Sequence, residues 1–111
     1  MNKQSNPIDF VSVNEQTRQF DLLEDRAVSA EYNSQSRKLI IHLASGVDIA
    51  IPVALIEGLH DATEAQRADF LVTASGRGLH WDAIDVQLSV QSLLKGLYGS
   101  PRWMQRYAVA A

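Results

Sequence analysis

The sequence predicts an α+β fold: a small antiparallel sheet, made of a three-stranded meander and a short hairpin, packed by short helices and a C-terminal helix. Three observations predict it. Apolar residues alternate with polar ones over residues 28–51, a proline and a helix-capping signature follow over residues 52–68, and apolar residues return at helical spacing over residues 88–97. With 111 residues, 46% of them apolar, the chain can bury one hydrophobic core.

The first 27 residues differ from the rest in composition. Five acidic residues stand against three basic ones, and apolar residues are sparse. Two interpretations stay open: a mobile N-terminal arm, or a segment that docks on the core or on a second subunit through Phe20, Leu22 and Leu23. Residues 28–111 are expected to form a single α+β domain whose C-terminal tail begins at about residue 100.

Period-two alternation predicts the meander. Polar turns at residues 33–36 and at Ser45-Gly46 separate its three strands. One face of the sheet is expected to be buried, because alternate positions along the strands are apolar: Val28, Ala30, Tyr32, Leu39, Ile41, Leu43, Val47, Ile49 and Ile51.

Helix signals follow the meander. Pro52 suits the first turn of a helix, which is expected to last about two turns because Gly58 weakens it. Thr63 and Gln66 match a capping box, which predicts a second short helix that ends at residue 67 or 68. Residues 70–73 and 79–81 then predict a hairpin around a flexible turn at residues 75–78.

The last predicted helix begins after Ser89, a good N-cap residue, and ends at Gly99, which is placed for a left-handed C-terminal cap. Pro101 is expected to prevent its continuation. The predicted core combines this helix with the strands and contains Leu39, Ile41, Leu43, Ile49, Ile51, Trp81, Leu93, Leu94 and Leu97.

Composition excludes several classes of chemistry. The chain has no cysteine, which excludes disulfides, thiolate metal sites and cysteine nucleophiles. Its net charge of −3 argues against direct nucleic-acid binding. No apolar run approaches membrane-spanning length, and the N-terminus lacks the apolar stretch of a signal peptide. We therefore expect a cytoplasmic protein with no membrane association.

Catalytic and cofactor signatures do not emerge from the spacing of polar residues. His42, His60 and His80 are far apart and match no metal-binding motif. The Gly76-Arg77-Gly78 turn lacks the longer glycine pattern of a phosphate-binding loop. The sequence therefore predicts a protein that is not an enzyme and that needs no cofactor or metal.

Two places could contact a partner. The first is the corner formed by His80, Trp81, Asp82 and Asp85. It is interpreted either as the end of a strand whose carboxylates cap a turn, or as a binding surface. The second is Arg102 with Trp103, where the indole either packs back on the core or anchors a partner.

Four motifs in order resemble a bacterial domain-of-unknown-function family, number 2442 in that series, over about residues 28–99. They are the strand-turn-strand-Pro run of residues 39–56, Ala-Thr-Glu-x-x-Arg at residues 62–67, Gly-x-Gly-Leu-His-Trp at residues 76–81, and Leu-Ser-Val-x-x-Leu-Leu-x-Gly at residues 88–96. The chain departs from the family pattern at Asp82, where proline is usual, and at residues 84–87, where the usual Leu-Asp-Glu-Asp is Ile-Asp-Val-Gln.

The resemblance implies a small α+β domain and a non-enzymatic, antitoxin-like module that binds a small, toxin-like protein encoded by an adjacent gene. Two alternatives stay open. One is a transcription-linked accessory module that acts as a homodimer. The other is a small-ligand binder or minor enzyme that uses the corner from His80 to Asp85.

Overall fold

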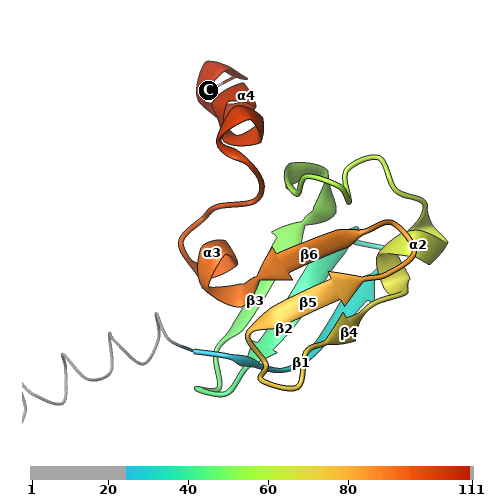
Figure 1. Ribbon diagram of the computed structural model, residues 1–111, viewed down its shortest axis with the longest axis vertical. Coiled ribbons are helices and arrows are strands. Elements are labelled where there is room, and N and C mark those ends of the chain that lie inside the picture. The colour runs from blue at the N-terminus through green and yellow to red at the C-terminus, as the bar shows by residue number, and fades with distance from the viewer. Residues whose placement is uncertain (1–24, 111) are drawn as a thin grey trace, which may run out of the picture.

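Two antiparallel three-stranded sheets and several short helices make up the fold in the computed structural model, which describes residues 25–110 (Figure 1). The first sheet, in strand order, contains β1 (Ala27–Asn33), β2 (Lys38–Leu43) and β3 (Asp48–Pro52). The second contains β4 (Leu71–Val72), β5 (Gly78–Trp81) and β6 (Val86–Ser89). The helices are the 3-10 helix η1 (Val53–Leu55) and the α-helices α2 (Glu64–Ala68), α3 (Val90–Leu94) and α4 (Pro101–Ala110). The predicted α+β class is confirmed, and most of the predicted N-terminal arm, with Phe20, Leu22 and Leu23, lies outside the described residues.

The predicted meander is present, but the first strand carries an irregularity. Ala27 pairs with Leu43 and Ser29 pairs with His42, so Val28 is an extra residue in a β-bulge. Ala27 is buried, whereas Val28 is 63% exposed. The predicted buried position of Val28 is therefore wrong, because the bulge reverses the side-chain alternation at that point. The strand also begins one residue earlier than the predicted domain boundary.

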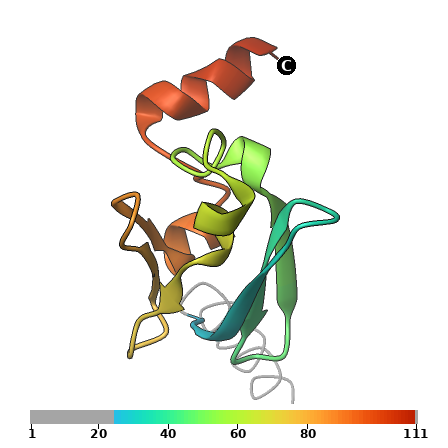
Figure 2. The ribbon, with the colours of Figure 1, turned by 90° about the vertical axis from the view of Figure 1, so that its right-hand side faces the viewer.

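The predicted hairpin is part of a larger sheet. β6 pairs with β5 in antiparallel register, from Gly78 opposite Ser89 to Trp81 opposite Val86. The sequence pattern predicts no strand here, because the alternation of Val86 and Leu88 is too short to be distinguished from a loop. Seen in Figure 2, the two sheets lie on opposite sides of the domain.

The hydrophobic core lies between the sheets. Of its predicted members, six are buried: Leu39, Ile41, Leu43, Ile51, Trp81 and Leu93. Ile49 and Leu94 are partly buried against the same cluster, but Leu97 is 47% exposed, so its prediction is wrong. The core also contains Leu79 of β5 and residues that follow η1, namely Ile56 and Leu59.

The helix predicted after Pro52 is shorter than expected. Only η1 is regular, and the chain then turns at Gly58, whose φ is +88°. A β-carbon at Gly58 would lie 2.6 Å from Cγ2 of Val86. Gly58 therefore serves both the left-handed turn and the close approach of this turn to β6.

The helix predicted after Ser89 is α3, and it also ends earlier than predicted. Ser89 caps it as expected, since its hydroxyl accepts a hydrogen bond from the Ser92 amide. The helix then stops at a Schellman motif: the Leu97 amide donates to the Ser92 carbonyl at 2.9 Å and the Gly96 amide donates to the Leu93 carbonyl at 3.0 Å. Gly96, at φ +80°, is the left-handed residue, so the cap predicted at Gly99 is wrong.

Gly99 and Pro101 have other roles. A β-carbon at Gly99 would lie 2.7 Å from both Glu57 and Trp103, so the missing side chain permits a close approach. Pro101 does not end α3, which stops several residues earlier; it begins α4, because proline is well tolerated in the first helical turn. The predicted tail from about residue 100 is thus a helix, which stands away from both sheets (Figures 1 and 2).

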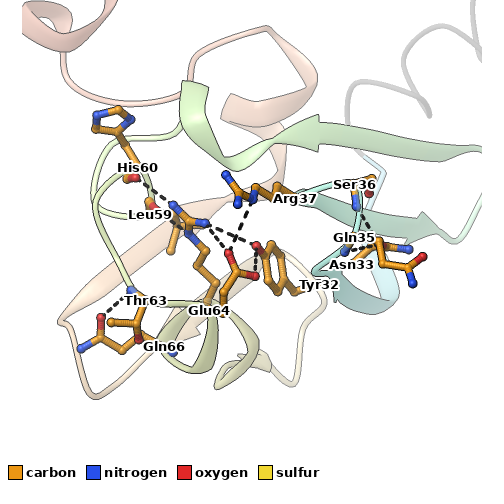
Figure 3. A network of polar contacts seen from close by, with 11 residues as sticks. Tyr32, Asn33, Gln35, Ser36, Arg37, Leu59, His60, Thr63, Glu64 and Gln66 are labelled. Carbon is orange, nitrogen blue, oxygen red and sulfur yellow. Dashed lines mark hydrogen bonds and ion pairs between the residues drawn. The ribbon is translucent and has the colours of Figure 1, made fainter.

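Helix α2 begins at the predicted capping box. The Gln66 amide donates to the Thr63 hydroxyl at 3.1 Å, and the Thr63 amide donates to the Gln66 side chain at 2.9 Å. On the other side of the helix, the Tyr32 hydroxyl of β1 donates to the Glu64 carboxylate at 2.7 Å, as Figure 3 shows. α2 is therefore tied to the first sheet.

Arg67 joins α2 to the rest of the domain. Its guanidinium donates to the carbonyl oxygens of Leu59 and His60, both at 2.8 Å, and to the Glu64 carboxylate at 3.0 Å. Its own carbonyl accepts from the indole N–H of Trp81 at 3.0 Å. The Arg67 side chain is only 11% exposed, so these charge-assisted bonds are shielded from water.

We predict that Arg67→Ala destabilises the fold by roughly 3 kcal/mol, because it removes charged hydrogen bonds and leaves two carbonyl groups without their donor. Arg37→Gln is the matched control. Arg37 approaches the same carboxylate, at 3.9 Å, but its side chain is 74% exposed, so its loss should change stability by less than about 0.5 kcal/mol. Urea unfolding of both variants measures the difference, and equal losses would contradict this role of Arg67.

A second polar cluster lies on the outer face of the first sheet. One ring nitrogen of His42 lies 2.9 Å from the Glu31 carboxylate of β1, and the other lies 2.9 Å from the Asp48 carboxylate of β3. Hydrogen bonding to Glu31, and then to Asp48, raises the pKa of His42 above its ordinary value of 6.5. The protonated imidazole thus links all three strands.

We predict that this cluster makes stability depend on pH. Because the pKa of His42 is raised in the folded state, its contribution is fully present below pH 6.5 and is lost as the pH rises through the folded-state pKa. An NMR titration of the His42 ring should give a pKa above 6.5, and Glu31→Gln should lower it. A wild-type pKa at or below 6.5 would contradict the prediction.

Candidate functional site

The predicted corner around residues 80–85 divides into separate environments. In β5, Leu79 and Trp81 point into the core and His80 points outward, as the strand alternation predicts. Trp81 is fully buried and its ring stacks on Phe70, with centroids 4.7 Å apart. Trp81 therefore serves the core and offers no surface to a partner, which corrects its assignment as a contact residue.

His80 and Asp82 form a loose pair at the surface. The Nε2 atom of His80 lies 3.5 Å from a carboxylate oxygen of Asp82, whose side chain is 99% exposed. Nδ1 of His80 is buried and has no hydrogen-bond partner in the described part of the chain. An exposed carboxylate at this distance does not make an enclosed acid–base site, so the geometry gives no support to catalysis here.

Asp85 lies in the turn between β5 and β6. Its φ is +53°, and its amide donates to the Asp82 carbonyl at 3.3 Å. Aspartate tolerates this left-handed conformation better than most residues. Unlike His80 and Asp82, Asp85 lines the largest groove described in the structure.

This groove has a volume of about 610 Å³ and runs along β6. One side is β6 itself, with Ile84 and Asp85 before it and Ser92 and Leu93 of α3 after it. The other side is formed by the turn at Glu57 and Gly58 and by the segment between α3 and α4, which contributes Leu97, Gly99 and Ser100. We call it the β6 groove.

The edge of β6 that borders the groove is unpaired. Among residues 25–110, β6 pairs only with β5. The Val90 amide donates to the Arg77 carbonyl, so alternation along the antiparallel ladder directs the main-chain groups of Leu88 toward β5. The intervening Gln87 therefore directs its N–H and C=O groups away from β5, and the Ser89 N–H points the same way.

The opposite wall is held by Glu57. Its amide donates to the Tyr98 carbonyl at 2.9 Å, and its carboxylate accepts from the Ser100 amide at 2.8 Å. These bonds fix the segment between α3 and α4 beside the turn. Glu57 and Asp85 are the charged residues that line the β6 groove, and both are acidic.

Trp103 anchors α4 to the body of the domain. It is 8% exposed, and its indole N–H donates to the Leu55 carbonyl at 2.8 Å. The Arg106 guanidinium carbon lies 4.7 Å from the indole centroid, which is a cation–π arrangement. The buried packing is thus the correct one of the two interpretations of Trp103. Arg102 is exposed and lines a smaller hollow of about 260 Å³ with Glu57, Trp103 and Arg106.

Sequence reasoning missed the groove residues Glu57, Gln87 and Leu97. Nothing in the local pattern marks Gln87, because its importance comes from the pairing of β6 with β5 on one side only. The position of Leu97 outside the helix could have been predicted from Gly96, since glycine just after a helix favours a left-handed C-terminal cap.

Within residues 25–110, no three or more His, Asp or Glu side chains are grouped so that they could hold a metal ion. The helices in this range are also too short or too polar to cross a lipid bilayer.

Comparison with known proteins places this geometry in a family. The model of the family described as "Protein of unknown function (DUF2442)" matches residues 27–99. A protein of unknown function from Rhodospirillum rubrum has a similar crystal structure, with 36% identity, a TM-score of 0.68, and coverage of 72% of this chain and 96% of that one.

An uncharacterized protein from Chromobacterium violaceum, whose solution structure was determined by NMR, shares the fold at 20% identity, with a TM-score of 0.69 and full coverage of both chains. No curated protein matches the chain. Because the family model covers most of the sequence, from the first strand to the end of α3, the chain belongs to the DUF2442 family.

Proposed function

We propose that the chain is a non-enzymatic protein-interaction module of the cytoplasm that binds an extended segment of a small protein partner in the β6 groove. One observation carries the proposal: β6, which pairs only with β5 among residues 25–110, lines a groove of about 610 Å³, and the main-chain groups of Gln87 point away from β5. An extended peptide can add to such an edge as a further strand, with main-chain hydrogen bonds providing affinity.

The protection of β6 supports the same proposal. Exposed edge strands invite unwanted pairing, and proteins often block them with charged residues or proline. β6 has the sequence Val-Gln-Leu-Ser and carries neither. Instead, the wall formed by Glu57 and the segment from Leu97 to Ser100 narrows access. Such a wall would hinder a broad sheet from pairing with this edge.

The family resemblance suggests the source of the partner. The candidate is a small, toxin-like protein encoded by the adjacent gene, which this chain would bind as an antitoxin-like module. A direct nucleic-acid role gains no support at the groove, because its charged side chains, Glu57 and Asp85, would repel phosphate groups.

We predict that Gln87→Pro abolishes binding of that neighbouring protein when the two are co-expressed and captured through an affinity tag. Proline removes the outward N–H of Gln87 and places its ring on the groove side, while the bonds between β5 and β6 use other residues. Gln87→Thr is the matched control, because it changes the side chain and keeps the N–H group.

The folded state of both variants is checked by thermal unfolding. The expected result is a complex with wild type and with Gln87→Thr, and none with a folded Gln87→Pro protein. In the wild-type complex, the amide NMR signals of Gln87 and Ser89 should shift and become protected from exchange. Binding that survives Gln87→Pro and leaves these two amides unchanged would refute strand addition at β6.

A further inference from the structure

Resting on the proposed function, we infer that the bound segment carries a Lys or Arg side chain for the carboxylate of Asp85 and, about four residues along, an apolar side chain for Leu97. The occupant is thus a short, extended, basic peptide segment of a partner protein. Charge complementarity and the distribution of apolar surface along the β6 groove support this choice.

The Asp85 carboxylate belongs to one end of the groove. Gly58 and Val86 are in close approach, since a β-carbon on Gly58 would meet Cγ2 of Val86 at 2.6 Å. Glu57 directly precedes Gly58, and Asp85 directly precedes Val86. Asp85 is therefore exposed beside the point at which the two walls come together, whereas the Glu57 carboxylate accepts a hydrogen bond from the Ser100 amide at 2.8 Å.

An exposed apolar side chain, that of Leu97, lies at the other end. The Leu97 amide donates to the Ser92 carbonyl at 2.9 Å, and the Ser92 amide donates to the Ser89 hydroxyl at 3.3 Å. Leu97 is thereby held near the last residue of β6, with 47% of its surface exposed. An exposed leucine that lines a groove beside an unpaired strand suits contact with an apolar side chain.

The length of β6 sets the spacing. Asp85 and Ser89 are four residues apart, which is about 13 Å along an extended strand. Side chains four residues apart on an added strand point to the same side, so a basic residue at one position and an apolar residue four positions along can contact both ends together. A single carboxylate, that of Asp85, also favours one basic residue over a long basic run.

Synthetic pentapeptides test the inference on the full-length protein. Acetyl-Lys-Thr-Val-Thr-Leu-amide and its reversed sequence are compared with the same two peptides in which Glu replaces Lys. Binding is followed by the amide NMR shifts of Gln87 and Ser89. We expect a Lys peptide to bind at least tenfold more tightly than its Glu counterpart, and its affinity to fall as salt is added.

Asp85→Asn should weaken binding of the Lys peptide by about fivefold and reduce its salt dependence, as expected for loss of one partly exposed ion pair. Asparagine also tolerates the left-handed backbone at this position. Asp82→Asn is the matched control. It removes the same charge three residues from Asp85, and the Asp82 side chain does not line the groove, so affinity should stay unchanged.

The outcomes separate the inference from the proposed function. Equal binding of Lys and Glu peptides at Gln87 and Ser89 would overturn the basic preference while leaving strand addition intact. Equal effects of Asp85→Asn and Asp82→Asn would overturn the assignment of Asp85. If no peptide shifts either amide and the neighbouring protein also fails to bind, strand addition itself is wrong.

Discussion

The arrangement of the domain depends on the hydrogen bonds that the Arg67 guanidinium donates. The guanidinium binds the carbonyl groups of Leu59 and His60, which belong to a turn with no regular secondary structure of its own. A turn without a ladder or helix needs other donors for its carbonyl groups, and an arginine with several fixed N–H groups can supply them at once. The Arg67 carbonyl also accepts a hydrogen bond from the indole N–H of Trp81, which belongs to the second sheet. One residue of a five-residue helix thus connects both sheets and the turn.

The same interaction shapes the β6 groove. The turn that Arg67 holds includes Gly58, whose contact with Val86 sets one end of the groove, and Glu57, which fixes the segment leading to α4. Trp103 then ties α4 to Leu55 at the start of that turn. Hydrogen bonds from side chains to main-chain groups therefore hold the wall of the groove at both ends. A pre-formed wall lowers the entropic cost of ordering a bound segment.

Local signals in the sequence predicted the local parts of the structure. The capping box of Thr63 and Gln66, the cap at Ser89 and the inward face of β2 were correct, because each depends on residues within a few positions. The bulge at Val28 and the strand β6 were missed, since both depend on pairing with a distant strand. For the same reason the candidate site was predicted only in part: Asp85 lines the groove, but no sequence pattern shows which edge of a sheet stays unpaired.

Different residues hold the domain together and line the groove. Glu64, Arg67 and Trp81 lie within the residues that the family model matches, and in the structure they hold helix, turn and sheets together. Asp85, Val86 and Gln87 line the groove, and Asp85 is the acidic residue among them. At position 86 a valine contacts the turn at Gly58, where a carboxylate would bring charge into an apolar contact. Val86 thus packs against the turn that forms the wall of the groove, while the neighbouring Asp85 stays exposed at its edge.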